Sequence, residues 1–443
     1  MKLRIFEDVE EARRGVLRRV AFDEVPTSPE LEQGIRRIFG EALTPAQVVA
    51  RILRDVRSKG DEALRDYAER IDGSRLEAIE VPRAQLDEAY GSIDSGLREA
   101  LEVAARQVRA FHERQYKDSW RHETAEGAVG QLVRPLQRVG LYAPGGRAVY
   151  PSTVIMAAVP AQVAGVEEIV VCSPAGKDGH VSPLILAACK LCEVDHVYAL
   201  GGAQAIAAMA YGTETVPRVD KILGPGNLFV VLAKRQVFGT VDIDQLPGPT
   251  EALVVADESA DPASVAADLL AQAEHDALAS PVLITPSRHL ADRVNDEIED
   301  LLQRLSRREI IEASMQRNGG IVLTSTTDEA IDLANEYAPE HMCLLIDQPW
   351  TKLERVRNAG GVFVGEACAE ALGDYVVGPS HIMPTGGTAR FSSALNVWDF
   401  LKIISVFGLN EQGVEGLAPA AITLAEAEGF TAHAEAIRMR LRK

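Results

Sequence analysis

Short apolar runs that alternate with helical stretches constrain this chain more than any other feature of its sequence. Two series of such runs follow one another, and several runs end in glycine. The first series comprises Val139–Tyr142, Glu168–Cys172, His196–Leu200, Lys221–Leu223 and Val241–Ile243. The second comprises Ala252–Ala256, Val282–Thr285, Ile321–Thr324, Met342–Ile346 and Val362–Val364. Repeated strand–helix–strand units predict mostly parallel sheets that are covered by helices on both faces.

The two series divide near Gly248-Pro249, so we expect two α/β domains. Before residue 135, apolar positions recur at helical spacing, as in Leu43–Arg70 and Ser95–Arg121, and predict a helical N-terminal region. Residues 415–443 are rich in Ala and Glu and predict a C-terminal helical arm that Gly429 interrupts. This arm packs either on its own body or on a second subunit, and the sequence leaves both open.

The chain carries 46 Lys and Arg against 65 Asp and Glu, a formal net charge of −19. Such a surface repels a phosphate backbone, so we expect no nucleic-acid partner. The most apolar stretch, Val149–Val166, contains two prolines and polar side chains, and we expect no membrane segment. Charges near the N-terminus argue against a signal peptide, and five cysteines are typical of reduced thiols. We therefore expect a cytoplasmic protein in which Cys189-Lys-Leu-Cys192 is packed in the core.

Gln272 and His275 lie three residues apart in a predicted helix over Ala266–Leu278. This spacing places both on one helix face, so both can reach one metal ion, although such pairs are more often solvated surface. His433 lies just after Thr431, which we predict to be the N-cap of a last helix. The first turn of a helix favours the neutral imidazole that binds metals. An exposed histidine in the tail is the alternative.

Asp374 lies in a glycine-bounded loop that ends at His381 and follows a predicted strand. We expect both side chains at the carboxyl end of a parallel strand, where open α/β sheets bind ligands, unless Asp374 merely caps a helix. Glu340 and His341 are adjacent and could act as two separate bases. Neighbours in a regular strand point to opposite faces, so a shared site requires irregular backbone here, which Pro339 favours. A helix-terminal glutamate beside a half-buried histidine is the alternative.

Segments spread in order over residues 139–433 together resemble the histidinol dehydrogenase family, zinc enzymes that complete histidine biosynthesis. They are Val139–Gly146, Tyr150–Val154, Gly201–Ala205, Asp220–Asn227, Gly248–Glu251, Gln272–His275, Tyr337–His341, Gly373–Tyr375, His381–Thr385 and Glu428–His433. Each segment alone is a weak signal, but the set is specific. The nearest approach to a dinucleotide-binding G-x-G-x-x-G is Gly224-Pro-Gly-Asn227, which lacks the third glycine.

The resemblance implies an enzyme that oxidises L-histidinol through histidinal to L-histidine with two NAD in succession. The implied zinc ligands are Gln272, His275, Asp374 and His433. The implied base of the alcohol step is His341, and a near-neutral pKa would suit it to that step. Glu340 is implied to activate water for the aldehyde step. The implied substrate contacts are Thr250, His381 and Glu428, together with His341 and the zinc ligands. The implied NAD contacts are Tyr142, Gln204 and Asn227.

The resemblance also implies an organisation into two Rossmann-like parallel-sheet domains. An N-terminal segment would cover residues 1–24, and a first α/β domain with the metal and substrate site would combine residues 25–138 and 248–390. A second α/β domain over residues 139–247 would hold NAD, and residues 391–443 would form the C-terminal arm. The family further implies a homodimer whose arm crosses to the other subunit and delivers Glu428 and His433 in trans.

Other classes of activity fit parts of this pattern. A sister dehydrogenase would oxidise another primary alcohol, although Glu428 and His381 fit an imidazole-bearing amino alcohol. A zinc hydrolase that uses Glu340 on metal-bound water would release its product without NAD. A protein that only binds metal would not need the separate segments around Tyr142, Gln204 and Asn227.

Overall fold

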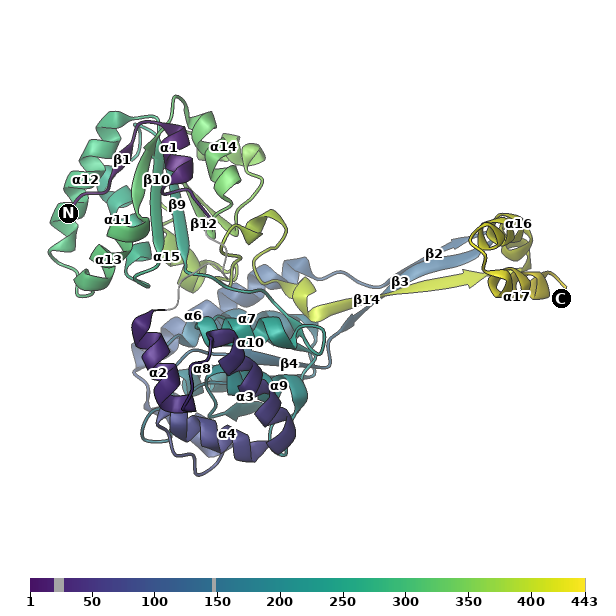
Figure 1. The fold of residues 1–443 in the computed structure, drawn as a ribbon. Helices are drawn as coiled ribbons and strands as arrows, with labels where there is room; N and C mark the ends of the chain where they lie inside the picture. The colour runs from purple at the N-terminus through teal and green to yellow at the C-terminus, as the bar shows by residue number, and fades with distance from the viewer. Residues whose placement is uncertain (20–27, 146–148, 443) are drawn as a thin grey trace.

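The computed structural model describes residues 1–19, 28–145 and 149–442 of the chain. Figure 1 shows two α/β bodies and a slender arm that carries the C-terminus away from both. The described strands form one five-stranded and one six-stranded sheet, both parallel, and a three-stranded antiparallel sheet in the arm. The expected α/β class with parallel sheets is therefore confirmed. Gly146, at the end of one predicted motif, and the expected boundary between residues 24 and 25 lie outside the described residues.

The five-stranded sheet forms from the first series of apolar runs. Its strands are β4 (Arg138–Tyr142), β5 (Glu168–Cys172), β6 (His196–Tyr198), β7 (Lys221–Leu223) and β8 (Asp242–Ile243), in the order β6-β5-β4-β7-β8. The helices between them are α7 (Pro151–Ala164), α8 (Pro183–Leu191), α9 (Gly202–Tyr211) and α10 (Leu228–Val237). The chain moves outward from β4 to β6 and then returns to the other side of β4 with β7. The strand order therefore reverses beside β4, which is where sheets of this kind bind ligands.

The N-terminal helices pack on this first body. They are α2 (Pro29–Phe39), α3 (Pro45–Lys59), α4 (Asp61–Tyr67), the π-helical turn η2 (Ala68–Asp72), α5 (Arg83–Ser92), α6 (Ser95–His112) and the short turn η3 (Glu113–Gln115). Their apolar side chains share one hydrophobic core with residues 139–241. This packing differs from the expected grouping of residues 25–138 with residues 248–390. The physical reason is that α7 and α9 are buried on nearly all faces, so they need a second layer of helices outside them.

The six-stranded sheet forms from the second series and gains an N-terminal strand. The strands are β1 (Ile5–Phe6), β9 (Glu251–Ala256), β10 (Ser280–Thr285), β11 (Gly320–Leu323), β12 (His341–Leu345) and β13 (Gly361–Val364), in the order β1-β11-β10-β9-β12-β13. The helical segments of this body are α1 (Val9–Arg14), α11 (Pro262–Ala273), α12 (Arg288–Leu302), α13 (Arg308–Asn318), α14 (Thr327–Tyr337) and η4 (Pro349–Arg355). Because β1 pairs with β11, the first residues belong to this second body.

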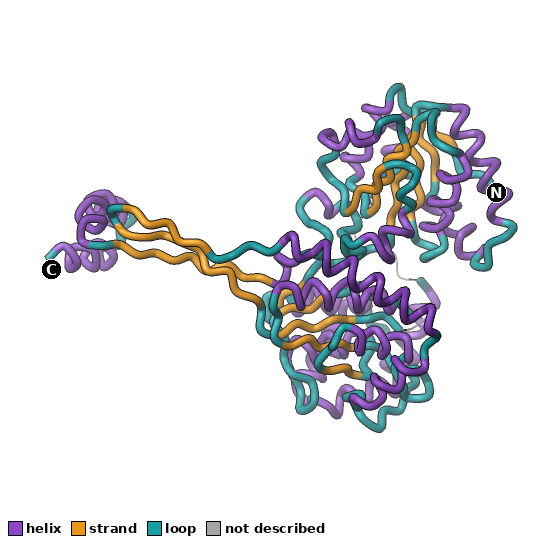
Figure 2. The backbone as a smooth tube through the Cα atoms, turned by 180° about the vertical axis from the view of Figure 1, so that it is seen from behind, coloured by secondary structure: helices purple, strands orange, loops and turns teal. Residues whose placement is uncertain are grey.

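The arm is an antiparallel ribbon that ends in two helices, as Figure 2 shows from behind. It contains β2 (Trp120–Thr124), β3 (Gly127–Pro135), β14 (Leu401–Leu409), α16 (Glu411–Ala427) and α17 (Thr431–Leu441), and the turns η6 (Thr388–Arg390) and η7 (Val397–Phe400) precede β14. The expected helices with a break at Gly429 (φ +80°) are confirmed, whereas Phe430 rather than Thr431 is the N-cap of α17. Phe407 is 86% exposed, so the ribbon presents apolar side chains to its surroundings.

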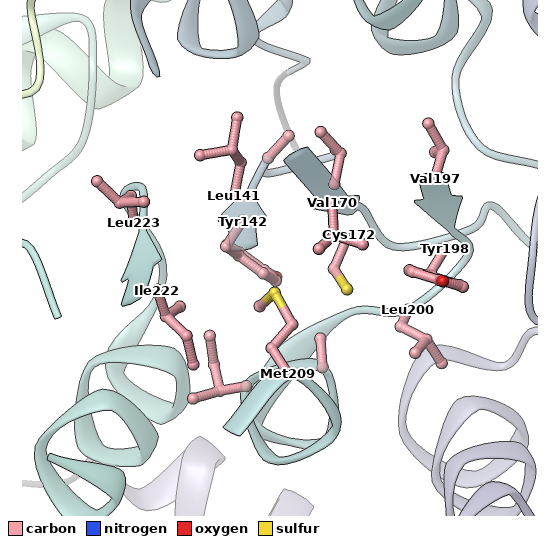
Figure 3. Close-up of a cluster of buried hydrophobic side chains, with 14 of the residues drawn as sticks. Leu141, Tyr142, Val170, Cys172, Val197, Tyr198, Leu200, Met209, Ile222 and Leu223 are labelled. Atoms are coloured by element: carbon pink, nitrogen blue, oxygen red, sulfur yellow. The ribbon is translucent and has the colours of Figure 1, made fainter. Parts of the chain in front are cut away.

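The core of the first body is shown in Figure 3, where side chains of β4, β5, β6 and β7 lie together. Met209 lies against Gly140, at which a Cβ atom would come within 2.5 Å of its sulfur. Cys189 and Cys192 are buried free thiols, which confirms that their spacing reflects core packing. Among the described residues, no helix is both long and apolar enough to span a bilayer.

Candidate active site

Glu340 and His341 lie where α14 turns into β12. Ala338 has a φ of +54° and Pro339 follows it, so the backbone is irregular here as the sequence predicted. His341 is the first residue of β12 and pairs in register with Ala252, near the beginning of β9. The two side chains therefore lie at the amino edge of the six-stranded sheet. The expectation that Asp374 and His381 lie at the carboxyl end of a strand is wrong, because Asp374 contacts His341 at this amino edge.

Both side chains face one small space around the beginning of β9. Glu340 Oε2 accepts hydrogen bonds from the Thr250 hydroxyl at 2.6 Å and from the Glu251 backbone N–H at 3.0 Å. His341 Nδ1 lies 3.0 Å from the Glu251 carbonyl oxygen and 3.6 Å from Glu340 Oε2. Burial raises the pKa of Glu340, and the neighbouring His341 charge only partly opposes this.

Carboxylates surround the His341 ring. Its Nε2 atom lies 3.3 Å from Asp374 Oδ1, and its Nδ1 atom lies 3.9 Å from Glu370 Oε1. Burial alone would lower the pKa of this imidazole, but the three neighbouring carboxylates outweigh burial and hold the pKa of His341 well above its usual value. This direction differs from the near-neutral pKa expected from the sequence, because the sequence pattern did not reveal how many acidic groups face the ring.

Asp374 lies in the π-helical turn η5 (Gly373–Val377), which follows the short helix α15 (Glu370–Leu372). The segment returns to the amino edge of the sheet, and Asp374 lies within the turn rather than capping it. His381 Nδ1 is 2.8 Å from the Asp374 carbonyl oxygen, and its Nε2 is 3.3 Å from the Thr153 hydroxyl at the beginning of α7. Burial lowers the pKa of His381. Since α7 follows β4, this contact joins the amino edge of one sheet to the carboxyl edge of the other.

Gln272 and His275 come from the end of α11. The helix ends at Ala273, earlier than predicted, so His275 lies in the turn after it. The Gln272 side-chain nitrogen donates to the Thr250 hydroxyl oxygen at 2.7 Å, which leaves the Thr250 hydrogen for Glu340. With the amide turned over, its nitrogen would donate to Glu370 Oε1 and its oxygen would accept from the Glu251 N–H, each at 2.7 Å. Burial lowers the pKa of His275, and the nearby Asp374 charge opposes this.

Glu370 is a site residue that sequence reasoning missed. It is 2% exposed, it lies 3.8 Å from the Cys343 thiol, and burial raises its pKa to about 8. Asp268, one helical turn before Gln272 on α11, is also buried, and burial raises its pKa to about 6. One signal in the sequence pointed to the two buried acidic residues Glu370 and Asp268, namely that Asp268 lies one helical turn before the predicted ligand Gln272.

The residues at this edge fit a divalent metal ion. Ligand atoms of His341, Glu370 and Asp374 lie within 4.8 Å of one another. With its amide turned over, Gln272 would donate to Glu370, and the charge of Asp374 acts on the pKa of His275. Burial favours the neutral form of His275. Burial raises the pKa of Asp374, but the His341 hydrogen bond and the charges of the nearby histidines together outweigh burial and lower it, which favours the ionised carboxylate. Neutral imidazole and carboxylate oxygen are ligand forms that Zn²⁺ accepts.

The remaining predicted ligand and one predicted substrate contact lie elsewhere in the chain. His433 is in the first turn of α17, and Glu428 is the C-cap of α16. Both helices are at the far end of the arm, away from the two bodies (Figure 1). A single chain therefore brings Gln272, His275 and Asp374 to one edge, but not His433.

The predicted NAD residues gather at the carboxyl edge of the five-stranded sheet, beside the reversal of strand order. Tyr142 ends β4, and its hydroxyl accepts a hydrogen bond from the Gly202 N–H at 3.1 Å. Gln204 Nε2 donates to Asp72 Oδ2 at 3.0 Å, and Asn227 is the N-cap of α10. Asp72 was not predicted, because an isolated aspartate at the end of a helix carries no pattern. Open α/β sheets bind dinucleotides in this position.

A glycine loop packs tightly on this edge. Gly224 has a φ of +110°, and a Cβ atom there would lie 2.2 Å from the Tyr142 carbonyl oxygen. Its N–H donates to Asp244 Oδ2 at 2.7 Å, and its carbonyl accepts from the buried Lys234 ammonium at 3.0 Å. Lys234 and Asp244 also form an ion pair. This buried pair fixes the Gly224 peptide on both sides.

Comparison with known proteins gives a consistent result. A family model described as histidinol dehydrogenase matches residues 40–441. Histidinol dehydrogenase from Deinococcus radiodurans is 55% identical over 438 residues, which cover 98% of each chain, and that from Thermus thermophilus is 50% identical over 90% of this chain and 95% of its own. The crystal structure of histidinol dehydrogenase from Elizabethkingia anophelis aligns with a TM-score of 0.91 at 32% identity, covering 99% of this chain and 98% of that one. The chain is therefore an enzyme of the histidinol dehydrogenase family.

Proposed function

We propose that this enzyme oxidises L-histidinol through histidinal to L-histidine and uses two NAD in succession. Family membership supports the reaction class. The observation that carries the proposal is the buried Glu340–His341 pair at the amino edge of the six-stranded sheet. The contact between His381 and Thr153 joins this edge to the five-stranded sheet. Each oxidation releases a hydride, which NAD accepts when bound, and a proton, which a side chain must accept.

His341 is the base of the alcohol step. In its neutral form the ring accepts the proton of the substrate hydroxyl as the hydride leaves, and the surrounding carboxylates stabilise the imidazolium that results. Glu340 acts in the aldehyde step, where it accepts a proton from the water that adds to the aldehyde carbon. The resulting hydrate then loses the second hydride and forms the acid. The Thr250 hydroxyl, 2.6 Å from Glu340 Oε2, orients that carboxylate.

Gln272, His275 and Asp374 would hold a zinc ion together with His433 from the arm of a second copy. When bound, the metal would bind the imidazole and the amine of the substrate and so position its hydroxyl, a role in which orientation lowers the barrier. The chemistry of the donor set supports this assignment, since burial keeps His275 neutral. Thr250, His381 and Glu428 would contact the substrate, together with His341 and these ligands.

The complete site requires a homodimer with exchanged arms. The arm exposes large apolar side chains along its ribbon and its helices, including Ile403, Phe407, Leu424 and Phe430. Extended apolar surfaces of this kind mark protein–protein contacts. The partner that covers this apolar surface is a second copy of the chain, because a second copy also supplies the missing His433.

A stoichiometric assay tests the reaction. Zinc-loaded enzyme is mixed with a limiting amount of histidinol and excess NAD, and we expect two NADH for each histidinol consumed. One NADH for each histidinol would mean that the reaction stops at the aldehyde. No NADH would reject the proposal. Product release in a parallel reaction without NAD would instead favour a hydrolase, and a panel of other primary alcohols tests the sister dehydrogenase.

Two variants separate the bases. His341→Asn should abolish oxidation of histidinol while zinc remains bound, because it removes the proton acceptor of the first step. Glu340→Gln should slow the oxidation of supplied histidinal more than that of histidinol. Equal loss in both steps would contradict this division between Glu340 and His341.

Subunit mixing tests the exchanged arms. Inactive His433→Ala chains are unfolded and refolded together with inactive His275→Ala chains. If the arm crosses, a mixed dimer contains one site without either substitution, and activity should return. Continued inactivity of refolded mixed dimers would place the whole site within one chain.

A further inference from the structure

Arg19 connects the N-terminal segment to the residues beneath the Glu340–His341 pair. Its guanidinium pairs with both carboxylate oxygens of Glu251, one of them at 2.9 Å. The same group donates to the Tyr337 carbonyl oxygen from Nη2 at 2.6 Å and from Nε at 3.2 Å. The guanidinium carbon also lies 3.5 Å from the centre of the Tyr337 ring. One side chain thus contacts two elements that are far apart in the sequence.

The first of these elements is the turn that leads into the catalytic pair. Ala338, the C-cap of α14, has a left-handed backbone conformation (φ +54°), which is unfavourable for a residue with a side chain. Arg19 Nη2 also lies 3.3 Å from the Ala338 carbonyl oxygen. This contact adds to the hydrogen bonds that Nη2 and Nε each donate to the Tyr337 carbonyl oxygen. The last carbonyls of a helix have no partner within the helix. Arg19 supplies these partners and so stabilises the turn before Glu340.

The second element is the beginning of β9. The Glu251 side chain is 6% exposed, and Arg19 neutralises it there. The backbone of the same residue contacts both bases: its N–H donates to Glu340 Oε2, and its carbonyl oxygen lies 3.0 Å from His341 Nδ1. Its carboxylate also accepts from the Gly386 N–H at 3.0 Å. The position of the Glu251 peptide groups therefore sets the orientation of both catalytic side chains.

We propose that Arg19 is a positioning residue that holds the Glu340–His341 pair in its reactive orientation through Glu251 and the Tyr337–Ala338 turn. This inference rests on the proposed function. It does not require Arg19 to contact the substrate. The role depends on the planar guanidinium, whose several N–H groups reach a carboxylate and two carbonyls at once, which a lysine ammonium cannot reproduce.

The test is the variant Arg19→Lys, which keeps the charge. Loss of groups that orient catalytic or ligating side chains typically costs about 10- to 100-fold in activity, and we expect such a fall in kcat for histidinol oxidation. The KM values for histidinol and NAD should change by less than about threefold, because Glu251, Tyr337 and Ala338, which Arg19 contacts, are not among the proposed substrate or NAD contacts. In Arg19→Ala, added guanidinium at low millimolar concentration should restore part of kcat, since it can occupy the vacated space.

Arg13→Lys is the matched control. Arg13 lies in the same N-terminal segment and forms an analogous bidentate pair with Glu336, the neighbour of Tyr337, at 2.8 to 3.1 Å. This pair is exposed, and it contacts neither Glu251 nor the turn before Glu340. We expect the wild-type kcat for Arg13→Lys.

The outcomes separate this inference from the proposed function. Wild-type enzyme that fails to oxidise histidinol would reject the proposed function itself. If the wild type is active, an Arg19→Lys kcat within about twofold of it would overturn the positioning role. A loss that is fully explained by a smaller folded fraction, measured by circular dichroism, would overturn it as well. Should Arg19→Lys not fold, Arg19→Ala with and without guanidinium decides, and an absence of rescue would count against the role.

Discussion

Asp72→Asn should make the enzyme more stable at alkaline pH. Asp72 ends η2, accepts one hydrogen bond from Gln204, and is held at a pKa of about 6 by burial, against 3.8 for a free side chain. The folded protein thus binds a proton more tightly than the unfolded chain, so stability falls as pH rises through this interval. The destabilisation by the buried Asp72 charge is nearly absent below the pKa of the unfolded chain, 3.8, and complete above the pKa of the folded protein, about 6. Asparagine keeps the hydrogen-bond acceptor for Gln204 and removes the charge.

The shift of roughly two pKa units corresponds to about 3 kcal/mol at pH 8, and linkage reduces this to about 1 kcal/mol at pH 4.5. Urea unfolding of the wild type and Asp72→Asn at both pH values measures the difference. Asp66→Asn is the control, because Asp66 lies on neighbouring α4 with a half-exposed side chain and its exposed ion pair is worth little. An Asp72→Asn variant that gains nothing at pH 8, or gains the same amount at both pH values, would refute the reasoning.

Three further outcomes are expected. Lys234→Met should destabilise the first body by about 3 to 5 kcal/mol, since it leaves the Asp244 carboxylate buried without its partner; a thermal midpoint like that of the wild type would contradict this. Gly224→Ala should weaken NAD binding in a fluorescence titration, because a Cβ atom collides with the Tyr142 carbonyl and φ is +110°; unchanged affinity would mean that the loop adapts freely. Removal of bound metal with a chelator should abolish histidinol oxidation but not NAD binding, and added zinc should restore it; full activity without metal would reject the metal assignment.

Both parallel sheets could be predicted from local sequence. The apolar runs over 168–172 and 221–223 coincide with β5 and β7, because a buried parallel strand is apolar on both faces and is followed by a helix. The ribbon of the arm could not be predicted in this way, although the two helices at its end could. Its strands β3 and β14 are far apart in the sequence and expose large side chains such as Phe407, so neither periodicity nor an apolar run marks them.

The residues of the candidate site also fall into two groups, those that sequence motifs indicate and those that only the fold reveals. Gln272, His275 and Asp374 could be proposed from motifs, and the structure brings them to one edge. Glu370 and Arg19 could not, since single charged residues carry no signal until a fold surrounds them. Their importance depends on burial and on partners that come from other elements.

The sequence by itself determined where most strands and helices of the two parallel sheets form and which family the chain resembles, because these depend on residue order and local periodicity. The tertiary structure decided that Glu340 and His341 lie at the amino edge of the second sheet and that carboxylates raise the pKa of His341. It also decided that His433, in α17, is far from the other predicted ligands in the same chain. Distance and dielectric environment govern these properties, and neither exists before the chain has folded.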